Sequence, residues 1–142
     1  MPPGPNEPAG GIPTIFRVIV PVTDIDRASR FYATLLGLPG VRVTSGRHYF
    51  PCGGTILACF DPRADSDDFD LGPNPGHLYF AVGDLEEFYR RATELKAETL
   101  SPIEVQPWRE RSFYLKDPFG NKLCFVDRTT VFLGKEPFTL PP

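Results

Sequence analysis

Apolar residues recur first with the period of a strand and then with that of a helix in the first half of the chain. Between residues 16 and 22 the even-numbered side chains are all apolar, which predicts a β-strand with one face toward a core. Asp24 then provides a helix start, and apolar residues recur every three or four positions as far as Leu35, where Gly37 and a proline end the helix. Further short strands are predicted at 41–45, 48–52 and 55–60.

The second half repeats this order of elements. Val82 and Asp84 reproduce the Val-x-Asp arrangement of Val22 and Asp24, and Glu87 completes a capping box at the start of a second helix. The remaining predicted strands lie around 103–108, 111–116 and 121–127. The pattern therefore predicts an α+β fold in which two β-α-β-β-β modules form a curved mixed sheet around a shared cavity.

Composition divides the chain into five parts. Proline and glycine dominate residues 1–13, which we expect to be a flexible arm. Aspartate, proline and glycine likewise break the apolar pattern between the modules, which predicts a solvated linker. The expected boundaries are 1–13 for the arm, 14–61 for the first module, 62–75 for the linker, 76–128 for the second module and 129–142 for a C-terminal tail.

Charge and cysteine content exclude several classes of partner and of structural site. A net charge of −3 leaves no basic stripe to contact phosphates, so nucleic acid is not an expected partner. No apolar run is long enough for a bilayer and no leader is evident, so we expect a cytoplasmic protein without a membrane partner. Cys52, Cys59 and Cys124 form no CxxC pair and are odd in number, which argues against a disulfide framework and a zinc knuckle. A small molecule is the expected partner.

Alternation within strands predicts which side chains line the cavity. In the strand 78–82, Leu78, Phe80 and Val82 form an all-apolar face that suits helix packing, which leaves His77 and Tyr79 toward the cavity. By the same reasoning Arg17 and Ile19 face the cavity in the first module. In the last strand, which follows a turn over residues 117–121, Lys122, Cys124 and Val126 share one face and Leu123 and Phe125 the other, and one of these faces meets the helices.

Three segments in this order resemble the vicinal oxygen chelate superfamily, which includes glyoxalase I, extradiol dioxygenases, fosfomycin-resistance enzymes and bleomycin-resistance proteins. They are "VTDIDRASRFYATLLGLPG" at 22–40, "HLYFAVGDLEEFYRRA" at 77–92 and "DPFGNKLCFVD" at 117–127. The resemblance extends over residues 14–128 and implies the paired-module fold. It also implies a homodimer, because members of this superfamily commonly form dimers.

The metal enzymes of this superfamily carry ligands on the first and last strand of each module. Carried over to this sequence, those places fall on Arg17, His77, Cys124 and Leu57, with Cys59 the next residue on the expected face. Arginine and leucine offer no donor atom to a metal. One hypothesis is therefore a metal-dependent lyase or dioxygenase with an atypical His77 and Cys124 site, completed by Cys59 or His48, and with a divalent metal as cofactor. The hypothesis that we favour makes Cys124 a cavity-wall thiol and requires no cofactor.

The segment "QPWRERSFYLKDPFGN" at 106–121 resembles the bleomycin-resistance branch, whose members are metal-independent sequestering dimers. This favours a small-molecule binding protein that acts in sequestration or resistance. An arginine between Phe16 and Val18 is costly to bury without an anionic partner, which favours an acidic or phosphorylated ligand over a cationic one. The aromatic candidates for the cavity wall favour an aromatic ligand. A metal-free general base at His77, assisted by Lys122 or Glu104, is a further alternative. The candidate ligand-binding residues are Arg17, Tyr49, His77, Tyr79, Trp108, Arg111, Phe113 (or its neighbour Tyr114) and Cys124.

Overall fold

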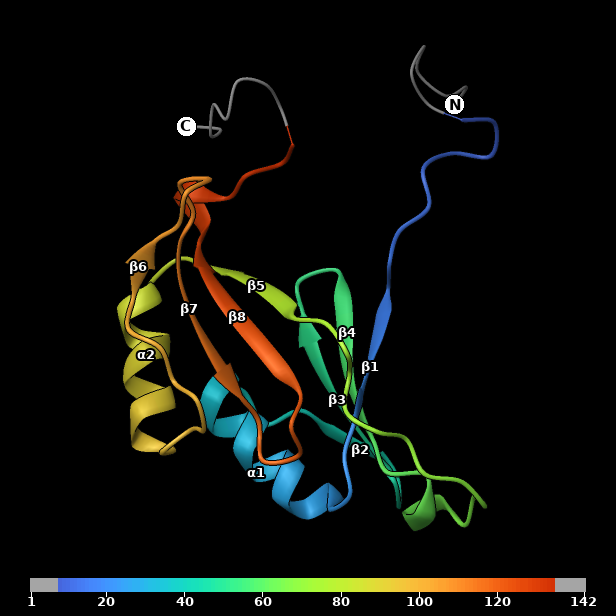
Figure 1. The fold of residues 1–142 in the computed structure, drawn as a ribbon. Coiled ribbons are helices and arrows are strands. Elements are labelled where there is room, and N and C mark those ends of the chain that lie inside the picture. The colour runs from blue at the N-terminus through green and yellow to red at the C-terminus, as the bar shows by residue number, and fades with distance from the viewer. Residues whose placement is uncertain (1–7, 135–142) are drawn as a thin grey trace.

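The computed structural model describes residues 8–134 and contains two helices and two four-stranded sheets (Figure 1). The first module consists of β1 (Arg17–Pro21), α1 (Ile25–Leu36), β2 (Val41–Thr44), β3 (Arg47–Cys52) and β4 (Thr55–Phe60). The second consists of β5 (Leu78–Val82), α2 (Leu85–Glu94), β6 (Glu104–Val105), β7 (Arg111–Lys116) and β8 (Lys122–Asp127). One turn of 3-10 helix follows each module, at Arg63–Asp65 and Arg128–Thr130. The predicted α+β class and the two β-α-β-β-β modules are confirmed.

Both modules have the same sheet topology. The strand order is β1-β4-β3-β2 in the first sheet and β5-β8-β7-β6 in the second. The first strand of each module runs parallel to the last, and the other neighbours are antiparallel, so each sheet is mixed. The helix and the intervening strands supply the long connection that a parallel pair needs.

The helices begin and end at the residues that the sequence indicates. The Asp24 carboxylate accepts a hydrogen bond from the Arg27 amide at 3.0 Å, and Asp84 accepts one from the Glu87 amide at 3.2 Å. These bonds satisfy backbone donors that have no partner inside the helix. Gly37 ends α1 with a φ of 76°, a left-handed conformation that glycine adopts without steric cost.

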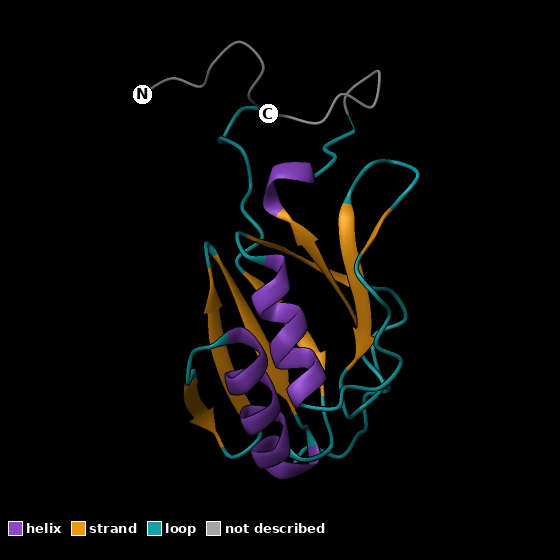
Figure 2. Cartoon of the chain, turned by 90° about the vertical axis from the view of Figure 1, so that its left-hand side faces the viewer, coloured by secondary structure: helices purple, strands orange, loops and turns teal. Residues whose placement is uncertain are grey.

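The two helices share one hydrophobic core. In Figure 2 they lie side by side in front of the strands, and the figure shows strands of the two sheets at either side. The buried cluster joins apolar residues of both modules, including Tyr32 and Leu35 of α1, Phe50 of β3, and Phe113 and Phe125 of the second sheet. Each sheet therefore has one face that packs on helices, and we call the opposite face its open face.

The turn between β7 and β8 ties the modules together. Asp117, fully buried at the start of this turn, accepts hydrogen bonds from the Tyr32 hydroxyl at 2.6 Å and from Asn121 Nδ2 at 2.7 Å. Asn121 Nδ2 also donates to the Pro21 carbonyl oxygen at the end of β1. Gly120 has a φ of 89°, as a tight reversal at this position requires. A single turn thus contacts both α1 and β1.

The segment predicted as a solvated linker has more structure than expected. Asp65 accepts hydrogen bonds from the Gly46 amide at 2.6 Å and from Arg47 at 2.7 Å, and Asn74 Nδ2 donates to the Ile19 carbonyl oxygen at 3.1 Å.

The predicted strand at 103–108 is shorter than expected, because Pro107 has no amide donor for a sheet ladder. In the described residues, no helix has the length and apolar character needed to cross a bilayer. The predicted arm up to residue 7 and the tail from residue 135 lie outside those residues.

Candidate functional site

Three side chains form a row across the open face of the second sheet. Cys124 on the central strand β8 is the register partner of Tyr79 on β5 and of Tyr114 on β7. Because side chains at one register level of a sheet point the same way, the thiol lies between two tyrosines. Tyr79 is 58% exposed, whereas Cys124 is only 1% exposed. The row therefore presents aromatic surface at its edge and protects the thiol at its centre.

The environment of this row suppresses ionisation. Burial raises the pKa of the Cys124 thiol to about 11, and hydrogen bonding with Tyr114 and Ser112 offsets only part of the rise. Burial, with the neighbouring Cys124, raises the pKa of Tyr114 to about 12. A nucleophile needs the thiolate, which is scarce at neutral pH at such a pKa. The geometry supports the interpretation of Cys124 as a cavity-wall thiol.

His77 lies next to the same row. Its ring packs edge-on against Tyr114, with centroids 5.1 Å apart, and lies 6.2 Å from the ring of Tyr79. The residue is exposed at the start of β5, on the side that alternation predicts. His77, Tyr79 and Cys124 are thus brought together as expected, and Tyr114 joins them.

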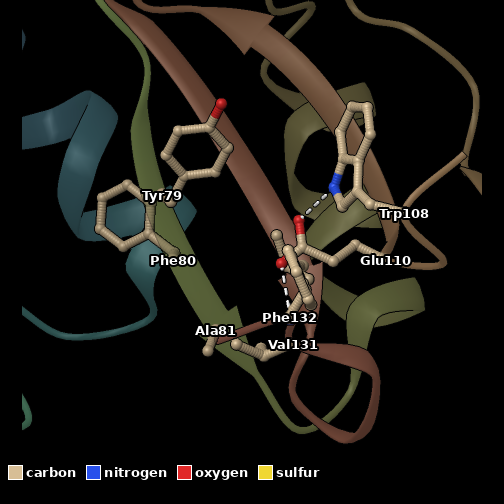
Figure 3. Close-up of a pocket in the computed structure, with 8 residues that line it drawn as sticks. Tyr79, Phe80, Ala81, Trp108, Glu110, Val131 and Phe132 are labelled. Carbon is tan, nitrogen blue, oxygen red and sulfur yellow. Dashed lines mark hydrogen bonds between the residues drawn. The ribbon is translucent and has the colours of Figure 1, made fainter. Parts of the chain in front are cut away.

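A pocket of about 630 Å³ opens beside this row, toward the far end of β5 and β8 (Figure 3). Its walls are mainly aromatic and aliphatic. They are formed by Tyr79, Phe80 and Ala81 of β5, Val126 of β8, Trp108 and Glu110 before and at the start of β7, and Val131 and Phe132 after the last strand.

Glu110 holds two walls of this pocket in place. Its Oε1 accepts a hydrogen bond from the indole Nε1 of Trp108 at 2.7 Å, and its Oε2 accepts one from the Phe132 amide at 2.9 Å (Figure 3). The Gln106 amide donates to the Glu110 carbonyl oxygen at 2.8 Å, closing the turn that carries Trp108. Within that turn Arg109 has a φ of 73°. Trp108 is therefore a fixed wall of the pocket.

The open face of the first sheet has an equivalent row without a thiol. Ala58 of β4 is the register partner of Ile19 on β1 and Tyr49 on β3. The guanidinium of Arg17 lies 5.0 Å from the ring centroid of Phe16 and 5.3 Å from that of Tyr49. Arg17 and Tyr49 thus lie together, as expected for residues of one cavity wall.

The structure corrects the ligand places assigned to β4. Leu57 and Cys59 point toward the helices and belong to the buried core, so neither faces the open side. The residue equivalent to Cys124 is Ala58, because both occupy the same register level beside the first strand of their module. A shift of one residue moves a side chain to the other face of a sheet. His48 is also on the helix side, where its ring packs on Phe50 and its Nε2 lies 3.0 Å from the Pro39 carbonyl oxygen.

Two further predicted ligand residues do not lie on the open face. Phe113 is fully buried, packed edge-on against Tyr89 and stacked on Phe125 in the helix-side core. Its neighbour Tyr114 is the aromatic residue of β7 that faces the open side. Arg111 also points to the helix side, where it forms ion pairs with Glu86 of α2 and Asp127 of β8.

The expectation of an anionic ligand rested on burial of Arg17, and this premise is wrong. Arg17 is exposed, and its cation is placed over aromatic rings of its own module. An exposed guanidinium that water can solvate needs no anionic partner.

The donor set does not fit the metal that the superfamily resemblance implies for its enzymes. Arg17 and Ala58 have no atom that can coordinate a metal, which leaves His77 and Cys124 at the implied places. Within residues 8–134, no group of three or more His, Cys, Asp or Glu side chains could hold a metal ion. A catalytic divalent ion requires three or four convergent ligands.

Glu110 and Phe132 are parts of the site that were not predicted from the sequence. Trp108 and Glu110 are two positions apart, a spacing that lets their side chains meet across a turn, and this signal was available. Phe132 contacts Glu110 from a distant part of the chain, so only the fold reveals it.

A second pocket, of about 670 Å³, opens between the modules and is lined by residues such as Val18, Leu38 and Phe88.

Solved structures of known proteins share this architecture. The lactoylglutathione lyase from Agrobacterium tumefaciens is 26% identical, with a TM-score of 0.64, over 82% of this chain and 94% of that chain. A glyoxalase/bleomycin resistance protein from Albidiferax ferrireducens T118 is also 26% identical, with a TM-score of 0.67, over 79% of this chain and 96% of that chain. A bleomycin-binding protein complexed with bleomycin is 23% identical, with a TM-score of 0.60, over 82% and 98% of the two chains. At that identity the last comparison concerns the fold alone.

No curated protein matches the sequence significantly. A family model, described as the Glyoxalase/Bleomycin resistance protein/Dioxygenase superfamily, matches residues 14–125. The match includes both modules, from β1 to the middle of β8. The paired-module topology and this match together show that the chain belongs to the Glyoxalase/Bleomycin resistance protein/Dioxygenase superfamily.

Proposed function

We propose that the protein is a metal-independent small-molecule binding protein that acts in sequestration or resistance. The observation that carries this proposal is the aromatic pocket on the open face of the second sheet, in which Glu110 fixes Trp108. Pockets of this size with mostly apolar walls and few placed polar groups are typical of small-molecule sites. The fixed indole lowers the entropy cost of stacking a planar ligand.

The residues at the metal-ligand places support the same proposal. Ala58 and Arg17 have no atom that can coordinate a metal, and His77 and Cys124 alone are fewer than the three or four ligands that a catalytic ion requires. A protein that relied on a metal would keep donors there, whereas a binding pocket has no such need. The bleomycin-binding protein with a similar fold is an example of a superfamily member that holds an organic ligand.

We also propose that the protein is a homodimer in which a second copy covers apolar residues of the open faces. Ile19 on the open face of the first sheet is 38% exposed, and Phe16, just before β1, is 60% exposed in one chain. Exposed apolar surface of this kind is typical of interaction sites. Light scattering should give the mass of a dimer, and Ile19→Asp should shift the equilibrium toward monomer. Val105→Asp, an exposed change on the edge strand β6, is the matched control and should leave the dimer intact.

Intrinsic fluorescence tests the binding proposal, because Trp108 is the only tryptophan. A panel of aromatic small molecules should contain ligands that change this fluorescence and raise the unfolding temperature, equally with and without chelator. Loss of binding in chelator would overturn metal independence.

The alternative, a metal-dependent lyase, is favoured by His77 on the open face and by the similarity to a lactoylglutathione lyase. It requires stoichiometric metal in untagged protein that disappears in Cys124→Ser, as measured by metal mass spectrometry.

A further inference from the structure

The charge of the pocket walls points to the class of ligand. Of the eight residues that line the pocket, Glu110 alone is an acidic or basic residue. The others are Tyr79, Phe80, Ala81, Trp108, Val126, Val131 and Phe132. We infer that the pocket binds an organic cation, namely a quaternary or protonated amine attached to an aromatic body. This inference rests on the proposed binding function and specifies its ligand.

Glu110 retains capacity to bind a cation. Its two oxygens accept one hydrogen bond each, from Trp108 and from the Phe132 amide. A carboxylate has about four acceptor sites, so about two are left. Both donors are uncharged, and no lysine or arginine forms an ion pair with Glu110 in the described part of the chain. The negative charge in this half-buried position is therefore held by neutral groups and is not neutralised.

The aromatic walls have the complementary property. The face of an aromatic ring attracts cations, most strongly in tryptophan. Elsewhere in the protein arginines occupy such faces, as Arg47 does over Phe60 at 4.0 Å and Arg91 over Phe88 at 4.6 Å. Among residues 8–134, no arginine occupies the face of Tyr79 or Trp108. These two rings and the Glu110 carboxylate can act together on one ammonium group.

Other ligand classes fit this pocket less well. An anion would enter an apolar space next to an uncompensated carboxylate, where repulsion is stronger than in water. An uncharged ligand would gain from the aromatic walls but would leave the carboxylate desolvated without a partner. Only a cation uses both the walls and the charge.

The experiment compares three probes of similar size. They are benzyltrimethylammonium, its uncharged carbon isostere neopentylbenzene, and the anion phenylacetate, each titrated against Trp108 fluorescence. We expect the cation to bind at least about tenfold more tightly than the isostere, and phenylacetate to bind most weakly. Glu110→Gln should weaken binding of the cation about tenfold while binding of the isostere is retained. Glu104→Gln removes the same charge from the exposed strand β6 and should change neither affinity.

Salt dependence in the unmodified protein provides a second readout that does not depend on folding of the Glu110 variant. Affinity for the cation should fall as ionic strength rises, and affinity for the isostere should not. Equal or tighter binding of the isostere or of phenylacetate, or no response to any of the three probes, would overturn the inference. The proposed function would survive that result, because it fails only if the wider panel yields no ligand or if binding needs a metal.

Discussion

The hydroxyl of Tyr32 in α1 donates a hydrogen bond of 2.6 Å to the carboxylate of Asp117, which belongs to the other module. Both residues are fully buried. Two backbone amides and Asn121 satisfy the remaining sites of the carboxylate. Burial, with the nearby Asp117, raises the pKa of Tyr32 well above its usual value, so the phenol stays protonated and remains a donor. This buried network joins the two modules.

Removal of that donor should destabilise the whole chain. Tyr32→Phe leaves a buried carboxylate without one of its charge-assisted hydrogen bonds, and we expect a loss of about 2 kcal/mol in the free energy of unfolding, measured with urea. Tyr89→Phe is the matched control, because Tyr89 packs on Phe113 while no hydrogen bond of its hydroxyl occurs among the described residues. Equal effects of the two variants would contradict the role given to the Tyr32 hydroxyl.

Replacement of Asn121 by aspartate should be more damaging and should depend on pH. Asn121→Asp loses the donor to Pro21 and Asp117 and places a second carboxylate next to the first, so we expect a loss of at least about 3 kcal/mol at neutral pH. One of two adjacent carboxyl groups has a raised pKa, so the variant should regain stability as the pH falls and that group takes up a proton. Asn74→Asp, a change at a less buried amide, should cost less, and urea unfolding at two pH values checks both.

The three cysteines should differ in reactivity in the folded protein. Burial raises the pKa of Cys59 to about 12 and that of Cys124 to about 11, and both thiols are almost inaccessible. Cys52 is half-buried, with a smaller rise. Iodoacetamide at pH 8 should therefore label Cys52 first, and all three in denaturant, as peptide mass spectrometry would show. Early labelling of Cys124 would contradict the protected position described above.

The same raised pKa values predict alkaline sensitivity. An unfolded thiol ionises near its ordinary pKa of 9.0, whereas Cys59 remains protonated in the folded state up to about 12. Between these values the folded state binds more protons, so stability must fall as the pH rises. The free energy of unfolding should decline from about pH 9 upward, and Cys59→Ala should show a shallower decline despite a lower stability at neutral pH. An identical slope in the two proteins would show that another group is responsible.

The sequence predicted the sidedness of β5 correctly because exposed and half-buried residues alternate there, as in Leu78, Tyr79 and Phe80. It failed on β4, where Leu57, Ala58 and Cys59 are all buried. Both faces of that strand are covered, so alternation carries no information about direction. Only the register with β1 identifies Ala58 as the counterpart of Cys124.

The candidate site was predictable where a residue acts within its own strand or turn. His77, Tyr79 and Trp108 fall into this group. Phe113 and Tyr114 are both aromatic, so composition could not separate the core residue from the half-buried one on the open face. Arg111 looked like a polar anchor, but its partner Glu86 lies on a helix distant in sequence, and the ion pair depends on the docking of α2. Contacts between distant segments are the part that local pattern cannot supply.

Glu110 couples the pocket to the segment that leads out of the second module, since one oxygen holds the Trp108 indole and the other holds the Phe132 amide. A cation bound at Glu110 therefore acts on the same carboxylate that anchors this segment. A fluorescent reporter fused after this segment would therefore be connected to the wall of the pocket, whereas one fused before β1 would be connected to the other module. The protein offers a natural attachment point for a genetically encoded biosensor of its own ligand.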